Sequence, residues 1–237
     1  MKIKLFTYWE GYKPEYIGLC EKIISDKIDS RIEHCKVSDE NIENYLSKED
    51  LSYIRNLECI AHKADYIRCC LIYKYGGIWL DSDQILISDL SEVVELLNTY
   101  DYITYEWEQN NPSIGFFASN KGNTFLGQWK DKMNTLLLSK NEFRWTELGY
   151  ELMYPILDDL LKNKKIKYYA FKARESFAPL EWCEYEKFFE PDINLDCKNL
   201  KSIMLYNSKF PDWFKTMTEK DILTKDYLIS KLFRNNI

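Results

Sequence analysis

Two aspartates, Asp81 and Asp83, follow a short apolar run at residues 78–80 and are separated by one residue. Side chains two positions apart on an extended backbone point the same way, so these carboxylates can converge. Carboxylate oxygens are hard ligands for Mg²⁺ or Mn²⁺, and water and substrate phosphates complete the coordination. The pair therefore predicts a metal–diphosphate site at the end of a strand. A solvated turn is the alternative, because this spacing also arises by chance in acidic proteins.

The residues before the pair predict the elements that position it. Apolar residues recur at three- and four-residue steps over residues 61–75, which predicts a helix with one buried stripe. Asp65 and Arg68 share a neighbouring face of that helix, where a surface ion pair would be worth at most about 0.5 kcal/mol. Gly76 and Gly77 predict the helix end. Residues 78–80 are apolar on both faces, which favours an interior strand.

The whole string of residues 61–83 resembles the DxD glycosyltransferases of the capsular-polysaccharide and initiating-mannosyltransferase type, including the sugar-binding region of glycosyltransferase family 32. The residues that occupy the family pattern in register are Ala61, Asp65, Arg68, Ile72, Gly76, Gly77, Trp79, Asp81 and Asp83. A similar arrangement occurs in the glucosylating domains of large clostridial toxins. The resemblance implies a GT-A fold, a nucleotide-sugar donor and a divalent cation, Mn²⁺ or Mg²⁺.

The resemblance also implies roles for the motif residues. Asp81 and Asp83 would hold the metal, Asp81 directly or through water and ribose. Asp65 and Arg68 would hydrogen-bond the donor sugar, because a carboxylate accepts from two hydroxyls and a planar guanidinium fixes orientation. These four residues form the expected catalytic set. Ser82 points away from the pair in an extended backbone, yet we expect it among the contacts to the nucleotide sugar.

Tyr8 and Trp9 end an expected first strand at residues 2–9. From location alone, core packing is the favoured role of Trp9. In the toxin relatives the matching tryptophan stacks on uracil, so the resemblance implies that Tyr8 and Trp9 belong to the nucleotide site. Stacking of a base on an indole is worth about 1–3 kcal/mol by analogy with single-strand recognition.

Residues 202–209 stand where family members commonly have a loop of the form x-x-H-x-W-x-x-S-W, which completes the metal and diphosphate contacts. This chain departs from that form, because Met204 or Tyr206 stands where histidine is expected. Asn207 and Ser208 are the best substitutes, and Asn207 is the expected third metal ligand. Lys209 could neutralise diphosphate charge, and a solvated lysine is the alternative.

An acceptor pocket is expected after the motif, in the polar aromatic loop that follows residue 100. The side chains of carbohydrate-contacting type there are Tyr105, Trp107, Asn110 and Asn111. An ordinary hairpin connection is an equal alternative. His62 lies outside the requirements of the motif, so we interpret it as structural.

The order of elements predicts an α/β fold. A strand at residues 2–9, a helix at 14–28 and a strand at 31–37 precede the motif, and a further core strand is expected at 85–87. This alternation favours a Rossmann-like, GT-A-type mixed sheet, mainly parallel and flanked by helices. We expect one domain, 1–237, with a nucleotide-sugar half at 1–110 and an acceptor-side half with the C-terminal helices at 111–237.

Composition excludes several classes of protein. The net charge of −6 and the pI near 5.2 argue against a nucleic-acid partner. Seven cysteines without CxxC or Cys/His clusters favour a reducing cytoplasm. The sequence shows neither a signal peptide nor a run of about 20 apolar residues. An amphipathic helix expected at residues 220–234 could touch anionic lipid at the inner membrane face, although core packing is the favoured role.

The expected activity is metal-dependent, retaining transfer of galactose or glucose from a UDP-sugar to a saccharide, lipid-linked oligosaccharide or other glycoconjugate acceptor. Synthesis of capsular or extracellular polysaccharide is the setting that the resemblance implies. Two other classes stay open. A haloacid-dehalogenase-like phosphohydrolase also carries a DxD after an apolar strand, and a non-catalytic carbohydrate-binding module would need the aromatic residues without the metal pair.

Overall fold

A six-stranded sheet in the order β2-β1-β3-β6-β5-β7 forms the centre of the computed structural model, which describes residues 2–55, 57–108 and 111–237. Strand β6 runs antiparallel to both of its neighbours, and the other neighbouring pairs are parallel. The strands are β1 (Ile3–Trp9), β2 (Ile32–Ser38), β3 (Gly77–Leu80), β5 (Tyr102–Trp107), β6 (Asn111–Ser119) and β7 (Tyr168–Lys172). The predicted mixed, mainly parallel sheet is therefore confirmed.

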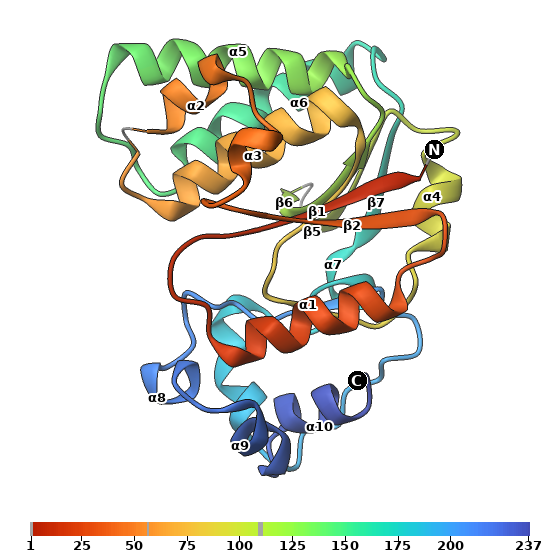
Figure 1. Cartoon of the computed structure of the whole chain (residues 1–237). Coiled ribbons are helices and arrows are strands. Elements are labelled where there is room, and N and C mark those ends of the chain that lie inside the picture. The colour runs from red at the N-terminus through yellow and green to blue at the C-terminus, as the bar shows by residue number, and fades with distance from the viewer. Residues whose placement is uncertain (1, 56, 109–110) are drawn as a thin grey trace.

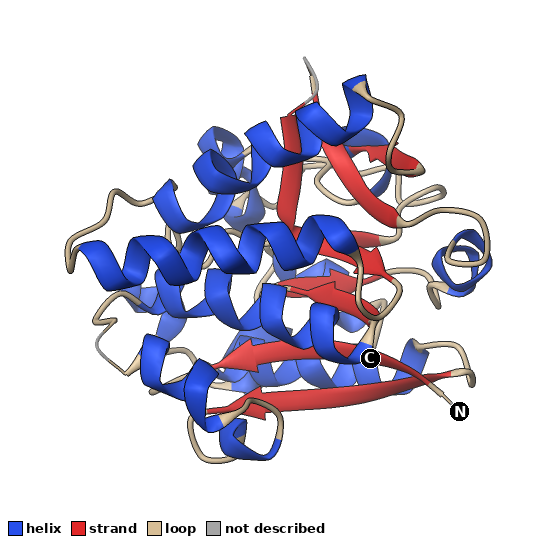
Figure 2. Cartoon of the chain, turned by 90° about the horizontal axis from the view of Figure 1, so that it is seen from above, coloured by secondary structure: helices blue, strands red, loops and turns tan. Residues whose placement is uncertain are grey.

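Helices cover both faces of the sheet (Figure 1). One face carries α2 (Lys48–Ile54), α3 (Ile60–Tyr75), α5 (Thr124–Ser139) and α6 (Leu152–Lys162). The other face carries α1 (Glu15–Lys27), α4 (Ser91–Leu96), α7 (Ala173–Ser176), α8 (Asp212–Lys215), α9 (Glu219–Thr224) and α10 (Leu228–Arg234). Each layer encloses its own apolar core. Figure 2 shows the twist between the strands, whose directions change from one side of the sheet to the other.

The turn from α3 to β3 forms as the sequence predicts. Gly76 has φ +69° and its N–H donates to the Ile72 carbonyl, which ends the helix. Gly77 has φ +106°, and a Cβ there would lie 2.1 Å from the Lys4 carbonyl oxygen. Only glycine lets β3 approach β1 this closely. All four residues of β3 are buried, in agreement with an interior strand.

The two-stranded pairing of β4 (Gln84–Leu86) with β8 (Ser202–Met204) lies outside the central sheet. The expected core strand at residues 85–87 therefore exists, but it joins the C-terminal part of the chain. The sequence reasoning did not predict β7, α7 or the 3₁₀ segment η3 (Trp182–Phe189). Each segment is short and buries only a few side chains, which weakens its signal, although Trp182, Tyr185 and Phe188 of η3 do recur at three-residue steps.

The expected helix at residues 220–234 is wrong as a single element. The backbone of Lys225 is extended, so α9 ends there and α10 begins at Leu228. The apolar side chains of α10 are buried in the core, which confirms packing as their role. No helix within the described ranges has the length and apolar character that a bilayer crossing requires.

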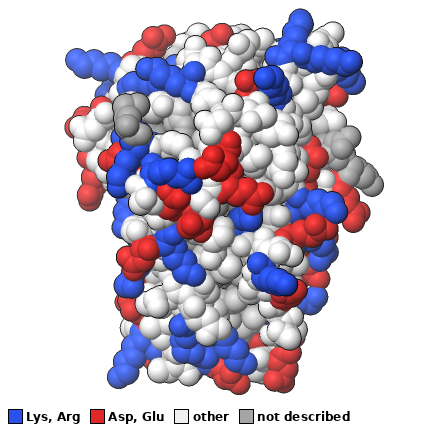
Figure 3. Space-filling model, turned by 90° about the vertical axis from the view of Figure 1, so that its right-hand side faces the viewer, with Lys and Arg blue, Asp and Glu red and all other residues white. Residues whose placement is uncertain are grey.

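Charges of both signs are mixed at the surface, and the cysteines, most of them buried, are unpaired. The face shown in Figure 3 carries Lys and Arg interspersed with Asp and Glu. All seven cysteine thiols are free.

Strands β1, β3, β5 and β7 run in one direction, so their carboxyl ends share one rim. Ligands of such sheets bind at that rim.

Candidate functional site

Arg68 on α3 joins two carboxylates at the carboxyl end of β3. Its Nη2 lies 3.5 Å from Oδ1 of Asp65 and 3.4 Å from Oδ1 of Asp81. The side chains of Asp65 and Arg68 keep only 7% and 8% of their exposure, so the alternative of a surface ion pair is wrong. Arg68 also donates from Nη1 to the Ile114 carbonyl at 2.6 Å and from Nε to the Ala64 carbonyl at 3.1 Å. The guanidinium is therefore fixed in one orientation.

Asp81 is oriented from its own strand and from β6. Nε1 of Trp79 donates to Asp81 Oδ1 at 2.8 Å, and the Trp79 ring lies 5.2 Å from the Arg68 guanidinium carbon. The Asp81 N–H donates to the Gly115 carbonyl at 2.8 Å. The Asp81 side chain keeps 26% exposure, so it can meet a ligand.

Asp83 is held by the C-terminal loop. Its Oδ2 accepts the backbone N–H of Asn207 at 2.7 Å, and its carbonyl accepts the N–H of Leu205 at 2.9 Å. Tyr206 between them has φ +57°, a left-handed conformation that turns the chain toward Asp83. The Asn207 side chain lies at the same place, and its Oδ1 accepts the Tyr16 hydroxyl. The loop expected to complete the site therefore reaches Asp83.

Burial raises the pKa of all three carboxyl groups. The pKa of Asp65 rises to about 7, although Arg68 opposes this. The pKa of Asp83 rises to about 6 because of burial and the charge of Asp81. Burial also raises the pKa of Asp81 against the effect of Arg68 and the Trp79 hydrogen bond. One guanidinium thus leaves a local excess of negative charge, which a cation would compensate.

Sequence reasoning missed three residues that surround this cluster, Gly115, Gly149 and Gln84. A Cβ on Gly115 would lie 2.8 Å from Asp81 Oδ2, and a Cβ on Gly149 would lie 2.7 Å from Asp65 Oδ2. Gln84 is fully buried and donates from Nε2 to the Gly115 carbonyl at 3.0 Å. Gly115 and Gly149 are far from Asp65 and Asp81 in the chain, so their spacing carries no signal and only the tertiary fold brings them together.

The end of β1 lies beside the aspartate pair. Ser82 Oγ donates to the Tyr8 carbonyl at 2.8 Å, so this buried serine joins β1 to the segment after β3. The Tyr8 hydroxyl donates to Glu10. Trp9 is partly buried against the core, and its Nε1 donates to the Tyr12 carbonyl at 3.0 Å. Its ring thus stands at the rim.

The remaining residues considered in the sequence are Ser208, Lys209 and His62. Ser208 and Lys209 are exposed in the turn after Asn207. The Lys209 ammonium lies 4.7 Å from the centroid of the Trp182 ring. His62 is buried, lies edge-on to Phe143 and pairs through Nε2 with the Arg144 carbonyl at 3.0 Å, which agrees with a structural role.

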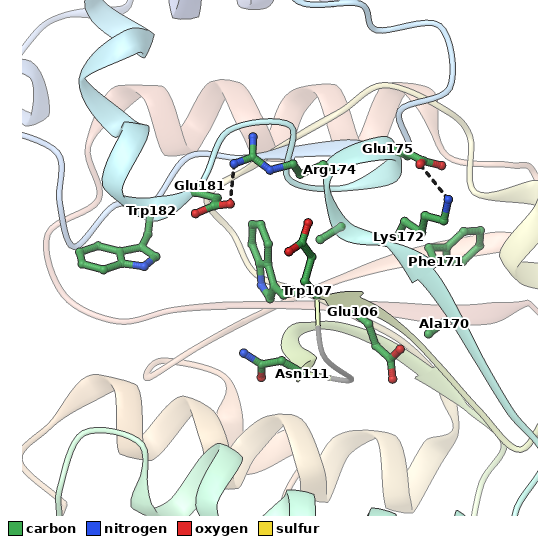
Figure 4. Close-up of a pocket in the computed structure, with 12 residues that line it drawn as sticks. Glu106, Trp107, Asn111, Ala170, Phe171, Lys172, Arg174, Glu175, Glu181 and Trp182 are labelled. Carbon is green, nitrogen blue, oxygen red and sulfur yellow. Dashed lines mark hydrogen bonds and ion pairs between the residues drawn. The ribbon is translucent and has the colours of Figure 1, made fainter.

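A cavity of about 710 Å³ opens at the ends of β5 and β7 (Figure 4). Trp107 and Asn111, both expected to contact an acceptor, line it. Tyr105 is buried and stacks on Phe177 at 5.1 Å between ring centroids. Asn110 lies outside the described residues. The other residues that line the cavity are Glu106, Glu108, Ala170, Phe171, Lys172, Ala173, Arg174, Glu175, Glu181 and Trp182.

A family model matches residues 2–177 under the description "Capsular polysaccharide synthesis protein". The chain belongs to this family. The resemblance predicted from residues 61–83 is therefore confirmed at the level of the family. The matched region includes the motif helix, strand β3 and the Gly115 and Gly149 positions, whereas the loop around Asn207 follows it.

Curated relatives of this chain carry a more specific name. Lactosylceramide 4-alpha-galactosyltransferase of Homo sapiens is 24% identical over 137 residues, which is 55% of this chain and 36% of the relative. The enzyme of Pan troglodytes has the same identity and coverage. The chain thus spans little more than a third of the length of these relatives.

Solved structures with a similar arrangement include the PaToxG glycosyltransferase, with 13% identity, a TM-score of 0.47, and coverage of 70% of this chain and 74% of that one. The glycosyltransferase GlyE of Streptococcus pneumoniae TIGR4 has 15% identity and a TM-score of 0.43, and the match covers 73% of this chain and 46% of that one. The galactosyltransferase LgtC, in complex with donor and acceptor sugar analogs, has 11% identity and a TM-score of 0.38, with coverage of 75% and 76%.

Proposed function

We propose that this chain is a metal-dependent, retaining glycosyltransferase that moves galactose or glucose from a UDP-sugar to a saccharide or lipid-linked acceptor. The observation that carries the proposal is the cluster at the carboxyl end of β3, in which the buried Asp65 and Arg68 lie beside the partly exposed Asp81 and Asp83. Membership of the capsular polysaccharide synthesis family and the galactosyltransferase names of the curated relatives support it.

The donor set fits a divalent cation. Within the described residues, no three His, Cys, Asp or Glu side chains are placed to hold one metal ion together, so the proposed site uses the Asp81 and Asp83 pair with other oxygen donors. Asp81 is held through Oδ1 and Asp83 through Oδ2, and each carboxylate therefore has a second oxygen to offer. Because Gly115 has no side chain, Asp81 Oδ2 has room at its present position. Hard oxygen donors with water and diphosphate complete a site for Mn²⁺ or Mg²⁺, with Asn207 as the third protein residue.

The protein residues would share the remaining tasks. A bound cation would act as a Lewis acid toward the leaving diphosphate. Arg68 holds Asp65 and Asp81 in place, and Asp65 would accept hydrogen bonds from donor-sugar hydroxyls. On the nucleotide side, the proposed contacts are the Trp9 ring, Tyr8 and Ser82, and on the diphosphate side they are Asn207, Ser208 and Lys209. Most of the proposed donor contacts therefore lie in residues 1–110, whereas the diphosphate contacts come from the C-terminal part of residues 111–237.

We infer front-face attack for the chemical step. The acceptor hydroxyl oxygen forms a bond to C1 on the face from which the diphosphate leaves, and the C1–oxygen bond to the diphosphate breaks. The acceptor proton passes to the leaving phosphate oxygen, so the step balances without a protein nucleophile. NMR of the product would contradict this step if a β-linkage arises from an α-donor. The proposed setting is polysaccharide synthesis at the cytoplasmic side of a membrane.

Hydrolysis of UDP-galactose and UDP-glucose without acceptor tests the donor site. We expect UDP release with Mn²⁺ that chelator abolishes and that Asp83→Asn or Asp81→Asn lowers by about 10²–10³-fold, since charge stabilisation of this kind has that magnitude. Asp26→Asn, at an exposed carboxylate paired with Lys22, is the matched control and should retain activity. Phosphate release from phosphomonoesters would indicate a phosphohydrolase instead. Sugar binding that ignores chelator, without UDP release, would indicate a binding module.

A further inference from the structure

The cavity between β5, β7 and η3 adjoins the proposed donor site through the C-terminal loop. The Tyr206 hydroxyl donates to the Leu180 carbonyl at 2.7 Å, and Glu181 and Trp182 of the cavity wall follow directly. Tyr206 itself precedes Asn207, whose N–H is bound to Asp83. The cavity and the aspartate pair therefore share one wall of the rim.

The buried Tyr105 gives a second connection between the two regions. Burial raises its pKa, and the charges of Asp81 and Asp83 add to this effect, so its hydroxyl lies within their field. Its neighbour Glu106 lines the cavity. The cavity at β5 and β7 thus lies on the side of the aspartate pair that is away from Trp9 and β1.

Two tryptophans supply flat apolar surface to the cavity. Trp107 ends β5 and Trp182 begins η3, where it keeps 58% exposure. In Figure 4, Trp107 lies beneath the Arg174–Glu181 pair, and Trp182 lies to the left, next to Glu181. The Lys209 ammonium over the Trp182 ring helps to hold that ring in place. Indole faces cover the C–H surfaces of sugar rings, and nearby amide and carboxylate groups serve the hydroxyls.

The charges in the cavity select the kind of sugar. Four carboxylates line it against two cations. Lys172 is paired with Glu175 at 3.0 Å, and Arg174 is held by Glu181 and by Glu184 at 3.2 Å. Both lining cations are therefore paired within the protein, and the four carboxylates still outnumber the cations when the Lys209 ammonium over the Trp182 ring is included, so the net charge is negative. A carboxylated, sulfated or phosphorylated sugar would be repelled.

We propose that this cavity is the acceptor subsite and that it takes the terminal residue of a neutral saccharide stacked on Trp107 and Trp182. The proposal rests on the glycosyltransferase function proposed above and adds the acceptor class to it. Glu106, whose Oε1 accepts the Tyr168 hydroxyl at 2.6 Å, is a fixed acceptor for a sugar hydroxyl.

Calorimetric titration of the whole chain with lactose, maltose and cellobiose, and with 3′-sialyllactose as the acidic probe, tests the subsite. We expect the neutral disaccharides to bind and the sialylated one to bind at least tenfold more weakly. Trp182→Ala should weaken neutral-sugar binding by about five- to hundredfold, the range of an aromatic stacking contact. Trp182→Phe should restore most of it. Trp145→Ala, at a tryptophan with 64% exposure outside the cavity, should change nothing.

The negative charge of the cavity is tested by a separate variant. Glu175→Gln removes the partner of Lys172 and one negative charge, so the preference for lactose over 3′-sialyllactose should fall several-fold. An equal loss of sugar binding in the Trp182 and Trp145 variants would overturn the subsite. Failure of every neutral disaccharide to bind the wild-type chain would do the same, as would equal binding of 3′-sialyllactose.

The donor reaction is measured separately, so the two proposals can fail independently. Absence of metal-dependent UDP-sugar hydrolysis with intact saccharide binding would refute the glycosyltransferase and leave the cavity as a sugar site. Hydrolysis without saccharide binding would refute the subsite alone. In the Trp182→Ala chain, the loss of disaccharide affinity should exceed any change in UDP-sugar hydrolysis.

Discussion

The carboxylate cluster and the tryptophan-lined cavity occupy one rim of the sheet but are built in opposite ways. In the cluster, Asp65 and Arg68 are almost fully buried, and each charged side chain is held by protein groups. In the cavity, Trp182 is more than half exposed and its charged neighbours are paired at the surface. Buried charge must be arranged by the fold, so changes there should affect stability and activity together. Exposed aromatic faces should affect ligand binding alone.

Replacement of the buried Arg68 should have the largest effect on stability. Arg68→Met leaves Asp65 and Asp81 without their partner, and we expect the free energy of unfolding to fall by about 3–5 kcal/mol in urea titrations. Asp65→Asn in the same chain should recover part of the loss, because one unpaired carboxylate is then gone. The comparison fails if Arg68→Met unfolds at the same urea concentration as the wild type.

The buried Asp65 should make the stability of the cluster depend on pH. Burial raises its pKa from 3.8 to about 7, so the folded state keeps a proton that the unfolded chain releases. The free energy of unfolding should therefore fall as pH rises from about 4 to about 7, by up to about 4 kcal/mol. The difference between wild type and Asp65→Asn at each pH isolates this contribution.

His34 changes the free energy of unfolding with pH in the opposite direction, so the wild type and Asp65→Asn must be compared at each pH. Burial lowers the pKa of His34 from 6.5 to about 4, so its contribution to stability is lost as pH falls through that interval. His34 is unchanged in Asp65→Asn. A wild-type-minus-variant difference that stays flat from pH 4 to 7 would show that Asp65 is not buried as a protonated group.

A methyl group at position 149, beside Asp65, should lower the free energy of unfolding less than the loss of Arg68 does. A Cβ at Gly149 would lie 2.6 Å from Ile114 Cδ1 and 2.7 Å from Asp65 Oδ2. We expect Gly149→Ala to destabilise the fold by about 1–3 kcal/mol through overpacking and to lower UDP-sugar hydrolysis. Gly18→Ala is the control, because it lies in α1 with no atom within 4 Å of its Cβ. That change should stabilise by about 0.5–1 kcal/mol.

Truncation of the exposed tryptophan should have the smallest effect on stability. Trp182→Ala loses the contact with Lys209, which is worth about 0.5–1 kcal/mol at an exposed site. Thermal unfolding of this variant should stay close to that of the wild type while disaccharide affinity falls. A destabilisation as large as that of Arg68→Met would remove the distinction between the two regions.

Much of the carboxylate cluster could be predicted from short-range sequence patterns. Asp65 and Arg68 lie one helical turn apart, Gly76 and Gly77 have the positive φ angles expected of a helix end, and Asp81 follows a buried strand. These features depend on the backbone geometry of neighbouring residues, so residue type and spacing suffice. Several of the strands and covering helices followed from the same periodicities, whereas β7 and α7 did not.

The supporting contacts could not be predicted in this way. Arg68 binds the Ile114 carbonyl, and Asp83 binds Asn207, across separations of 46 and 124 residues. The helix expected at residues 220–234 proved to be two helices, because the packing of α10 into the core decided where the chain turns. The role of Trp182 could not be predicted either, because the three-residue spacing of Trp182, Tyr185 and Phe188 indicates only a helical segment, and the partner Lys209 is remote in the chain.

By itself, the sequence determined the motif and the elements that present it, because hydrogen bonding and side-chain direction repeat over a few residues in helices and strands. The tertiary structure alone decided which carbonyls orient Arg68, which glycines make room for Asp65 and Asp81, and that Trp107 and Trp182 face one cavity. Those contacts join distant segments, and their geometry is set by how the layers pack on the sheet.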